Sequence, residues 1–388
     1  MTDLQQLPTF GRHLCRIEDF VAIIEQPTPT PEFAARLEQR VPIFEASRLR
    51  ALITDAASHR AVRDVLAEVL DRGAGIFVIA GAFDHDVVDR ATAAFQEMID
   101  QQHREGRSVG DHYAKPGAND RVWNAIEKLA VSAPDVFVDY YANDMAALGA
   151  LAWLGPGYQI SSQVNVVNPG GQAQQPHRDF HLGFMTDDEA EAYPAHTHRL
   201  SPMLTLQGAV AHCDMPVETG PTMYLPFSQQ YELGYLAWRN PDFVAYFAEH
   251  RTQLPLAKGD IVFFNPALFH AAGSNVTTDV RRMANLLQIS SAMARAMETM
   301  DRLRMSNAVY SALLERKAAG LDADSLTNAM TAAADGYAFP TNLDNDPPLG
   351  GLTPPSHLDI LRDALEHGVS PDELASRLDA LATRRSSH

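Results

Sequence analysis

The chain has 388 residues and a formal charge of −18 at pH 7, with 31 basic and 49 acidic residues. A hydrophobic content of 46% and a charged content of 21% are ordinary for a globular protein. The acidic balance argues against a broad surface for nucleic acid or for an anionic membrane, because both need clustered Lys and Arg.

Its two cysteines, Cys15 and Cys213, are too few for a disulfide framework, and neither lies in a CxxC pair of the kind that holds structural zinc. The N-terminus lacks the basic stretch and apolar run of a signal peptide, and no apolar run approaches the roughly 18 residues of a membrane span. We therefore expect a soluble, cytoplasmic protein.

Helical patterns dominate the first part of the chain. Apolar residues recur at helical spacing over 59–72 and 84–104, and we predict another helix over 133–153. The apolar run at 75–80 lies between the first two and is typical of a short buried strand. We interpret residues 1–156 as an N-terminal helical region with a short strand near 75–80.

The pattern changes to short strands after Gly157. Strands are predicted over 158–167, 203–213, 261–264 and 281–289, with Gly- and Pro-containing turns between them. From about residue 290 the pattern is helical again, over 291–305, 311–320 and twice within 355–384. We expect one domain whose catalytic core, 157–291, is a β sandwich or small barrel, followed by a C-terminal helical extension over 292–388.

Several common catalytic motifs are absent from the sequence. It contains no GxGxxG or GxxxxGK[ST] and no βαβα rhythm, which disfavours a dinucleotide-binding or P-loop fold. It contains no GxSxG, which disfavours a hydrolase with a nucleophile elbow.

The segment Gln175-Pro-His-Arg-Asp-Phe-His181 carries the first candidate metal ligands. On an extended chain, His177 and Asp179 project to the same face and Arg178 to the other. One imidazole and one carboxylate, joined by a distant histidine, form the facial triad of non-heme Fe(II) oxygenases. A lone HxD is nevertheless a weak signal.

His270 is the best candidate for the third ligand, because it follows the predicted strand 261–264. A histidine at a strand end is more often a hydrogen-bonded core residue, but Arg281 follows eleven residues later. That separation brings the chain back along a neighbouring strand. There an arginine side chain clamps a carboxylate with two parallel hydrogen bonds, as the far carboxylate of 2-oxoglutarate requires.

Together these motifs resemble the phytanoyl-CoA dioxygenase (PhyH-like) family of Fe(II)- and 2-oxoglutarate-dependent oxygenases. The resemblance covers roughly 75–290 and rests on His177-x-Asp179, the segment 218–229, Gly259-Asp260 and His270 with Asn275 and Arg281. It implies a mainly β core with α additions, namely a double-stranded β-helix (jelly roll, cupin-like) flanked by N- and C-terminal helices. In that family a Pro-Gly-Ser-His-like segment lies between the metal ligands, and here Leu225-Pro-Phe-Ser-Gln229 lacks the histidine.

The same resemblance implies roles for individual residues. His177, Asp179 and His270 would bind Fe(II), and Arg281 would bind the cosubstrate 2-oxoglutarate. Arg282 would be the clamp instead if the strand register slipped by one residue, and we favour Arg281 on spacing.

Further candidates lie on the predicted strands and just after the HxD motif. Gln163 and Thr205 are candidate cosubstrate contacts and Asn165 a candidate substrate contact, although all three, like Gln207, could equally be strand-edge polar residues. The candidate pocket wall is Phe180, His181 and Phe184, where His181 matches a second histidine common in the family and the two Phe residues could equally be core.

Asp179 bears on the reaction, because related halogenases replace this carboxylate so that chloride can bind iron. Its presence favours hydroxylation of an unactivated C–H bond in a small metabolite or natural-product intermediate, with O₂ as the second substrate. Two alternatives stay open: a metal cupin that works without 2-oxoglutarate, as an isomerase or dioxygenase, and a non-enzymatic binding protein. We expect a monomer or homodimer with no nucleic-acid or membrane partner.

Overall fold

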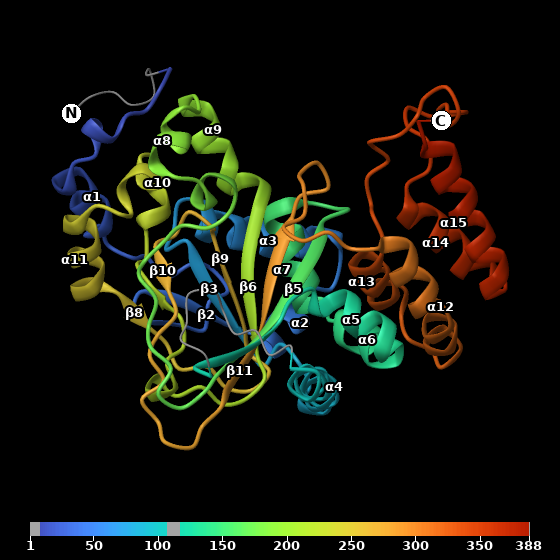
Figure 1. Cartoon of the computed structure of the whole chain (residues 1–388), viewed down its shortest axis with the longest axis horizontal. Helices are drawn as coiled ribbons and strands as arrows, with labels where there is room; N and C mark the ends of the chain where they lie inside the picture. The colour runs from blue at the N-terminus through green and yellow to red at the C-terminus, as the bar shows by residue number, and fades with distance from the viewer. Residues whose placement is uncertain (1–7, 107–116, 388) are drawn as a thin grey trace.

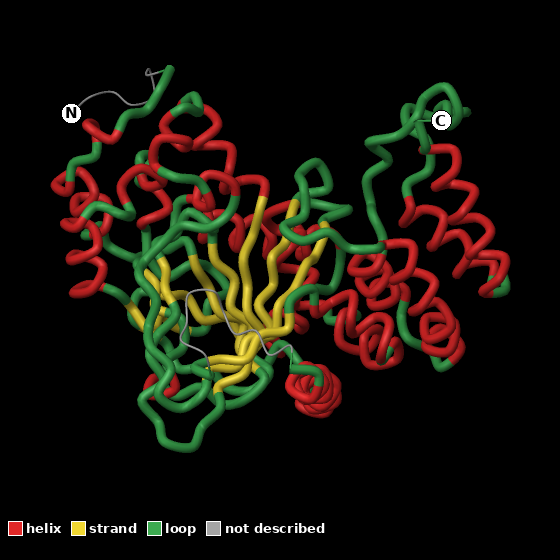
Figure 2. The backbone as a smooth tube through the Cα atoms, in the orientation of Figure 1, coloured by secondary structure: helices red, strands yellow, loops and turns green. Residues whose placement is uncertain are grey.

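The computed structural model describes residues 8–106 and 117–387, which form a mixed α/β fold with a central β layer (Figures 1 and 2). The larger sheet has eight strands in the order β1-β2-β3-β9-β6-β11-β5-β4, and the smaller has the order β10-β7-β8. The strands are β1 (Arg36–Glu38), β2 (Val41–Glu45), β3 (Ile76–Ala80), β4 (Asn119–Val122), β5 (Gln159–Val167), β6 (Thr205–Ala211), β7 (Met223–Tyr224), β8 (Thr252–Gln253), β9 (Ile261–Phe264), β10 (His270–Ala271) and β11 (Arg282–Ser290).

Helices surround the β layer. Helices α12 to α15 lie at one end of the molecule with α5 and α6, whereas α1 and α11 lie at the opposite end (Figure 1). The helices are α1 (Ile17–Ile24), α2 (Ala46–Leu52), α3 (Ala56–Asp71), α4 (His85–Arg104), α5 (Ala125–Ser132), α6 (Pro134–Tyr141), α7 (Asp144–Leu154), α8 (Asp187–Glu191), α9 (Ala195–Leu200), α10 (Gly234–Ala237), α11 (Pro241–His250), α12 (Arg302–Ala318), α13 (Ala323–Ala333), α14 (His357–His367) and α15 (Pro371–Arg385).

One face of the large sheet, here called the outer face, is covered by helices. Side chains alternate between faces along a strand, so Phe77 of β3 and Phe263 of β9, which are register partners, both point outward. They share one apolar cluster with Leu66 of α3 and Leu148 of α7. Burial of this face is the main source of stability for the sheet.

The opposite face, here called the inner face, faces the small sheet. Val78 of β3, Val262 of β9 and Ala209 of β6 are register neighbours on this face. They belong to a second apolar cluster that includes Met223 and Tyr224 of β7. Two sheets therefore enclose an interior, and the candidate ligands lie within it.

The structure confirms several predicted elements and corrects others. α3, α4, β3, β5 and β9 confirm the elements expected at 59–72, 84–104, 75–80, 158–167 and 261–264. The single helix expected over 133–153 is two helices, because the chain leaves the helix after Tyr141 and the Asn143 side chain caps α7 by accepting from the Ala146 N–H. The helix expected over 291–305 begins only at Arg302.

Strands β1 to β4 all precede residue 157 and all join the large sheet. The N-terminal region thus supplies half of that sheet's strands, although only the strand at 75–80 had a clear sequence signal. The division proposed at residue 156 falls between β4 and β5, which are paired neighbours in the sheet. No helix in the described ranges is both long and apolar enough to cross a membrane.

Candidate metal centre

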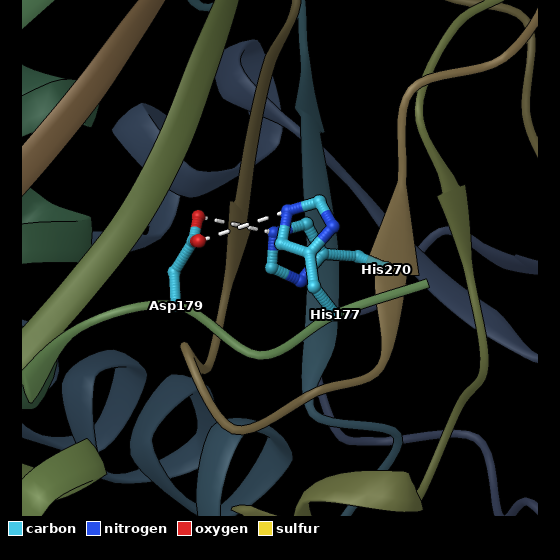
Figure 3. Close-up of side chains that lie close together, drawn as sticks. All are labelled: His177, Asp179 and His270. Atoms are coloured by element: carbon cyan, nitrogen blue, oxygen red, sulfur yellow. Dashed lines mark hydrogen bonds and ion pairs between the residues drawn. The ribbon is translucent and has the colours of Figure 1, made fainter. Parts of the chain in front are cut away.

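The structure brings His177, Asp179 and His270 together between the two sheets (Figure 3). One ligand atom from each side chain lies within 4.8 Å of the others. His177 and His270 lie on adjacent extended segments, where the His177 N–H donates to the His270 carbonyl at 2.9 Å and the His270 N–H donates back at 3.2 Å. The backbone pairing therefore fixes the separation of the two imidazoles.

Both imidazoles are held in the orientation that a metal ion needs. Nδ1 of His177 lies 2.9 Å from the Gln175 carbonyl, and Nδ1 of His270 lies 2.8 Å from the Leu268 carbonyl. Because a carbonyl only accepts, each Nδ1 carries a proton, so Nε2 is the atom of each ring that would bind a metal ion. The two Nε2 atoms face Asp179, at 3.6 Å for His177 and 3.3 Å for His270.

Asp179 is held as an anion at this position. Burial raises the pKa of its carboxyl, but the His177 and His270 imidazoles and a hydrogen bond from Gln207 outweigh burial and hold that pKa well below its usual range. Gln207 Nε2 donates to Oδ2 at 2.6 Å and so orients the carboxylate. Two imidazole lone pairs and one carboxylate oxygen converging on one point fit a divalent transition-metal ion, with three donors on one side and open positions on the other.

Arg178 anchors the ligand segment on its other side. Its side chain is 2% exposed and points away from His177 and Asp179, as the alternation predicts. Nη2 donates to the carbonyls of Ser228 at 2.6 Å and Tyr231 at 2.9 Å. The guanidinium therefore ties the ligand segment to the loop after β7.

The two neighbouring arginines lie on opposite sides of the sheet, and this bears on the choice between Arg281 and Arg282. The Arg281 side chain is 45% exposed and pairs with Asp120 at 3.2 Å. Arg282, the first residue of β11, is 4% exposed and lines a cavity between the two sheets. A shift of one residue in the strand register moves a side chain to the opposite face of the sheet. The spacing counted from His270 could not distinguish Arg281 from Arg282.

One residue that lines this cavity is a neighbour of a candidate ligand. Tyr224, which lines it, is the register partner of His270. The Phe264 ring lies 4.8 Å from the His270 ring and 5.1 Å from the Tyr224 ring. The candidate ligands themselves do not line the cavity, so Tyr224 and Phe264 lie between His270 and the cavity that contains Arg282.

The other predicted contacts on strands lie on the inner face. Gln163 and Asn165 of β5 and Thr205 of β6 are all buried, as is Gln207. Of these, Gln207 contacts a candidate ligand directly. Gln163 instead donates to the Met297 sulfur at 3.8 Å.

The residues after Asp179 turn sharply away from the sheet. Phe180 and His181 both have positive φ angles, 59° and 36°, and lead into a short 3₁₀ helix over His181–Phe184. Phe180 is buried, His181 Nδ1 lies 2.9 Å from the Ser201 hydroxyl, and Phe184 is 56% exposed. The structure thus places Phe184 at the surface and not in a closed aromatic wall.

Two polar residues of this region had not been identified from the sequence. Gln288 of β11 is the register partner of Gln207, and Glu298 follows β11 in an irregular segment. Gln288 has no clear sequence signal, because the inward positions of β11 include apolar Ala284 and Leu286 and the outward positions include polar Asn285. Glu298 has none, since it lies outside any strand.

A comparison with protein-family models finds a match to phytanoyl-CoA dioxygenase (PhyH) over residues 72–283. This range contains the three candidate ligands and both arginines. A search of curated proteins finds no match.

The solved structures that match the chain include the following three, each with a TM-score below 0.5. The α-ketoglutarate-dependent epimerase SnoN from nogalamycin biosynthesis is 21% identical over 60% of this chain and 84% of its own, with a TM-score of 0.40. The α-ketoglutarate-dependent carbocyclase SnoK from the same biosynthesis is 20% identical over 58% and 83%, with a TM-score of 0.42. AviO1 from Streptomyces viridochromogenes Tue57 is 19% identical over 61% and 97%, with a TM-score of 0.43.

Proposed function

The chain belongs to the phytanoyl-CoA dioxygenase family, and on that premise we propose that it hydroxylates an unactivated C–H bond of a small metabolite or natural-product intermediate. The family and the His177–Asp179–His270 group together give iron as the cofactor and 2-oxoglutarate as the cosubstrate. We propose these three residues as the iron ligands. The two facing sheets with the ligands between them support a double-stranded β-helix as the core.

One observation carries the proposal: a buried cation, Arg282, lines the cavity between the two sheets, which also includes the register partner of His270. Arg282 has no carboxylate within ion-pair distance among the described residues, and burial lowers the pKa of its guanidinium to about 10. A buried charge is costly unless it is paired. The far carboxylate of 2-oxoglutarate would supply that partner, so we assign the carboxylate clamp to Arg282 in place of Arg281.

The chemistry that bound iron and 2-oxoglutarate supply is oxidation of a C–H group to an alcohol, coupled to conversion of O₂ and 2-oxoglutarate into succinate and CO₂. The chain's own residues orient the reactants. The Gln175 and Leu268 carbonyls fix the two imidazoles, and Gln207 orients the Asp179 carboxylate that would bind the metal. Arg282 would neutralise the cosubstrate carboxylate with parallel hydrogen bonds.

The alternative of a metal cupin that works without 2-oxoglutarate depends on the same arginine position. An arginine directed to solvent would favour that alternative, and Arg281 lies on the outer side, where it is partly exposed and pairs with Asp120. Arg282 takes the inner position and favours the oxygenase. We also propose cytoplasmic action on a small molecule with O₂, as a monomer or homodimer.

The test is formation of succinate from 2-oxoglutarate after anaerobic loading with Fe(II) and addition of O₂. Succinate should depend on iron and be lost in His177→Ala. Arg282→Ala should raise the KM for 2-oxoglutarate by roughly 10–100-fold, because it removes charged hydrogen bonds each worth about 1.5–3 kcal/mol.

Arg281→Ala is the matched control, because it removes the same side chain one residue away. Its KM for 2-oxoglutarate should equal that of wild type. Anaerobic titration should also produce a metal-to-2-oxoglutarate charge-transfer band. If wild type gives neither the charge-transfer band nor succinate, the metal cupin is favoured. If only Arg281→Ala raises the KM for 2-oxoglutarate, Arg281 and not Arg282 is the carboxylate clamp.

A further inference from the structure

A band of polar side chains crosses the inner face from the metal centre toward β5. We call Thr205 and Gln207 of β6, Gln288 of β11, and Gln163 and Asn165 of β5 the polar band. Gln207 contacts Asp179 at 2.6 Å, and Gln288 is its register partner on the next strand. All five side chains are buried. The band therefore begins at the candidate iron ligands.

Most of these side chains carry a buried oxygen that the described protein leaves without a hydrogen bond. The atoms are Asn165 Oδ1, Thr205 Oγ1, Gln207 Oε1 and Gln288 Oε1. A buried polar atom without a partner destabilises the folded protein, and several of them on one face of a sheet, with Thr205, Gln207 and Gln288 adjacent, are unusual in a protein core. Such a group is expected where a ligand completes the hydrogen bonds.

The chain that follows β11 adds a carboxylate to the far side of the band. Glu298 Oε1 accepts from the Asn124 N–H at 2.8 Å. Burial raises the pKa of this carboxyl group, and the nearby Gln163 side chain and the Asn124 N–H partly offset that effect. Its other oxygen, Oε2, is buried and has no partner among the described residues. The segment that leads into the C-terminal helices thus places an anionic acceptor beside the polar band.

The unpartnered atoms call for a ligand that donates hydrogen bonds. The amide of Gln207 cannot be reversed, because its nitrogen must donate to Asp179, so its free atom is an acceptor. The carboxylate oxygens of Glu298 are acceptors as well. A fatty acyl chain has no donors, and 2-oxoglutarate as a dianion has none either. Neither compound satisfies this part of the interior.

The rest of the inner face is mostly apolar. Val78 of β3, Val262 of β9 and Tyr224 of the small sheet line the cavity that also contains Arg282. We have proposed this cavity for 2-oxoglutarate. No residue of the polar band lines it, so the unpartnered oxygens of the band are a separate feature of the inner face.

We propose that the substrate is a hydroxyl-rich compound of the sugar or polyol type, bound along the polar band with Glu298 as its anionic contact. Hydroxyl groups both donate and accept, which matches side-chain amides better than an ammonium group does, since the band contains four amides and one hydroxyl and only Glu298 beside it is a carboxylate. The proposal rests on the proposed oxygenase function for its reaction. The role it gives to the band and to Glu298 can be measured separately.

The first test needs no substrate. Thr205→Val and Gln288→Leu remove oxygens without partners and keep the approximate shape, so the melting temperature of the ligand-free protein should rise by about 1–4 °C. Ser162→Ala is the matched control on the outer face of β5, where the Ser162 hydroxyl lies 3.1 Å from the Tyr141 hydroxyl. It should lower the melting temperature. Destabilisation by both inner-face variants would overturn the proposal.

The second test measures succinate formation with two sets of probes. Methyl α-D-glucopyranoside, myo-inositol and trehalose represent hydroxyl-rich compounds, and decanoate and decanoyl coenzyme A represent acyl compounds. At least one hydroxyl-rich probe should stimulate succinate formation by wild type and by Ser162→Ala. Glu298→Gln should raise the KM for that probe by roughly 10-fold, because a hydrogen bond to a charged group is lost, with a smaller change in the KM for 2-oxoglutarate.

Stimulation by the acyl probes alone, or by no hydroxyl-rich probe while basal succinate persists, would overturn the substrate class. If Glu298→Gln has the same KM for the probe as wild type, Glu298 does not contact the substrate. Absence of any iron-dependent succinate would instead contradict the proposed oxygenase, and the melting temperatures would still decide whether the polar band is built for a ligand.

Discussion

The two faces of the large sheet differ in how their buried polar groups are paired. On the outer face, Thr92 Oγ1 lies 2.8 Å from His212 Nδ1, and His212 Nε2 lies 2.9 Å from the Tyr140 hydroxyl. Asn285 Nδ2 donates to that hydroxyl at 3.2 Å, so in this chain of side chains only Asn285 Oδ1 lacks a partner. The inner face instead leaves four oxygens of the polar band unpaired.

The difference teaches which face serves stability and which serves binding. Paired polar groups and close-packed rings on the outer face hold the sheet to the helices. Unpaired groups and the buried Arg282 on the inner face cost stability and are useful only when a ligand is present, a trade-off common at functional sites. Mutations on the two faces should therefore have opposite effects on stability and on binding.

The largest effect on stability is expected for Phe263→Ala on the outer face. Phe263 is fully buried, lies 5.6 Å from the Phe77 ring, and fills the space left by Gly149 and Gly208. The variant should lose about 3–5 kcal/mol of unfolding free energy in urea. Its affinity for Co(II), used as a stand-in for iron, should equal that of wild type. A loss below about 1 kcal/mol would contradict the assignment of stability to this face.

Asp179→Ala on the inner face should weaken metal binding, in contrast to the loss of stability expected for Phe263→Ala. Loss of a ligand should weaken Fe(II) binding by more than about 100-fold, since even residues that only orient ligands contribute about 10–100-fold. Anaerobic metal titration measures the change. Asp89→Ala is the control, because the Asp89 side chain is 58% exposed and pairs with Lys258. Similar affinities in both variants would show that Asp179 is not a ligand.

Tyr140→Phe tests the paired network of the outer face. Without the hydroxyl, buried His212 and Asn285 each lose a hydrogen-bond partner, so the free energy of unfolding should fall by about 1–3 kcal/mol. Tyr158→Phe is the matched control, because Tyr158 is buried with no side-chain hydrogen bond in the described structure. Its change should stay within about 0.5 kcal/mol, and an equal loss in both variants would argue against a special role of the network.

His212 should also make stability depend on pH. Burial lowers the pKa of its imidazole to about 3 in the folded protein, against about 6.5 when unfolded. Between these values the unfolded chain binds more protons, so this contribution to stability is complete above about pH 6.5. It should fall on acidification by up to about 1.4 kcal/mol per pH unit. Urea unfolding of wild type and His212→Gln at several pH values gives the dependence of the unfolding free energy on pH. If this dependence is the same in both proteins, His212 is not its source.

Arg281→Ala should have the smallest effect. Its pair with Asp120 is partly exposed, and such pairs contribute less than about 1 kcal/mol. Urea unfolding should therefore barely distinguish the variant from wild type. A loss of several kcal/mol would show that the outer position of Arg281 carries more of the fold than its exposure indicates.

Local patterns in the sequence were sufficient for much of the fold and for the candidate ligands. The alternation in an extended chain placed His177 and Asp179 on one face and Arg178 on the other, and helical spacing predicted α3 and α4. These signals depend only on residues near one another in the chain. Helical spacing did not reveal the break after Tyr141, where a cap at Asn143 starts a new helix.

What only the tertiary structure decided is the pairing of distant segments. Whether Arg281 or Arg282 points inward depends on the register of β11 against β5 and β6, and a shift of one residue reverses every side chain. The position of Glu298 beside Gln163 depends on the path of an irregular segment. The sequence by itself therefore determined which chemical groups are available, whereas the packing of the sheets decided which of them share an interior, because burial and contact between distant segments arise only when the whole chain folds.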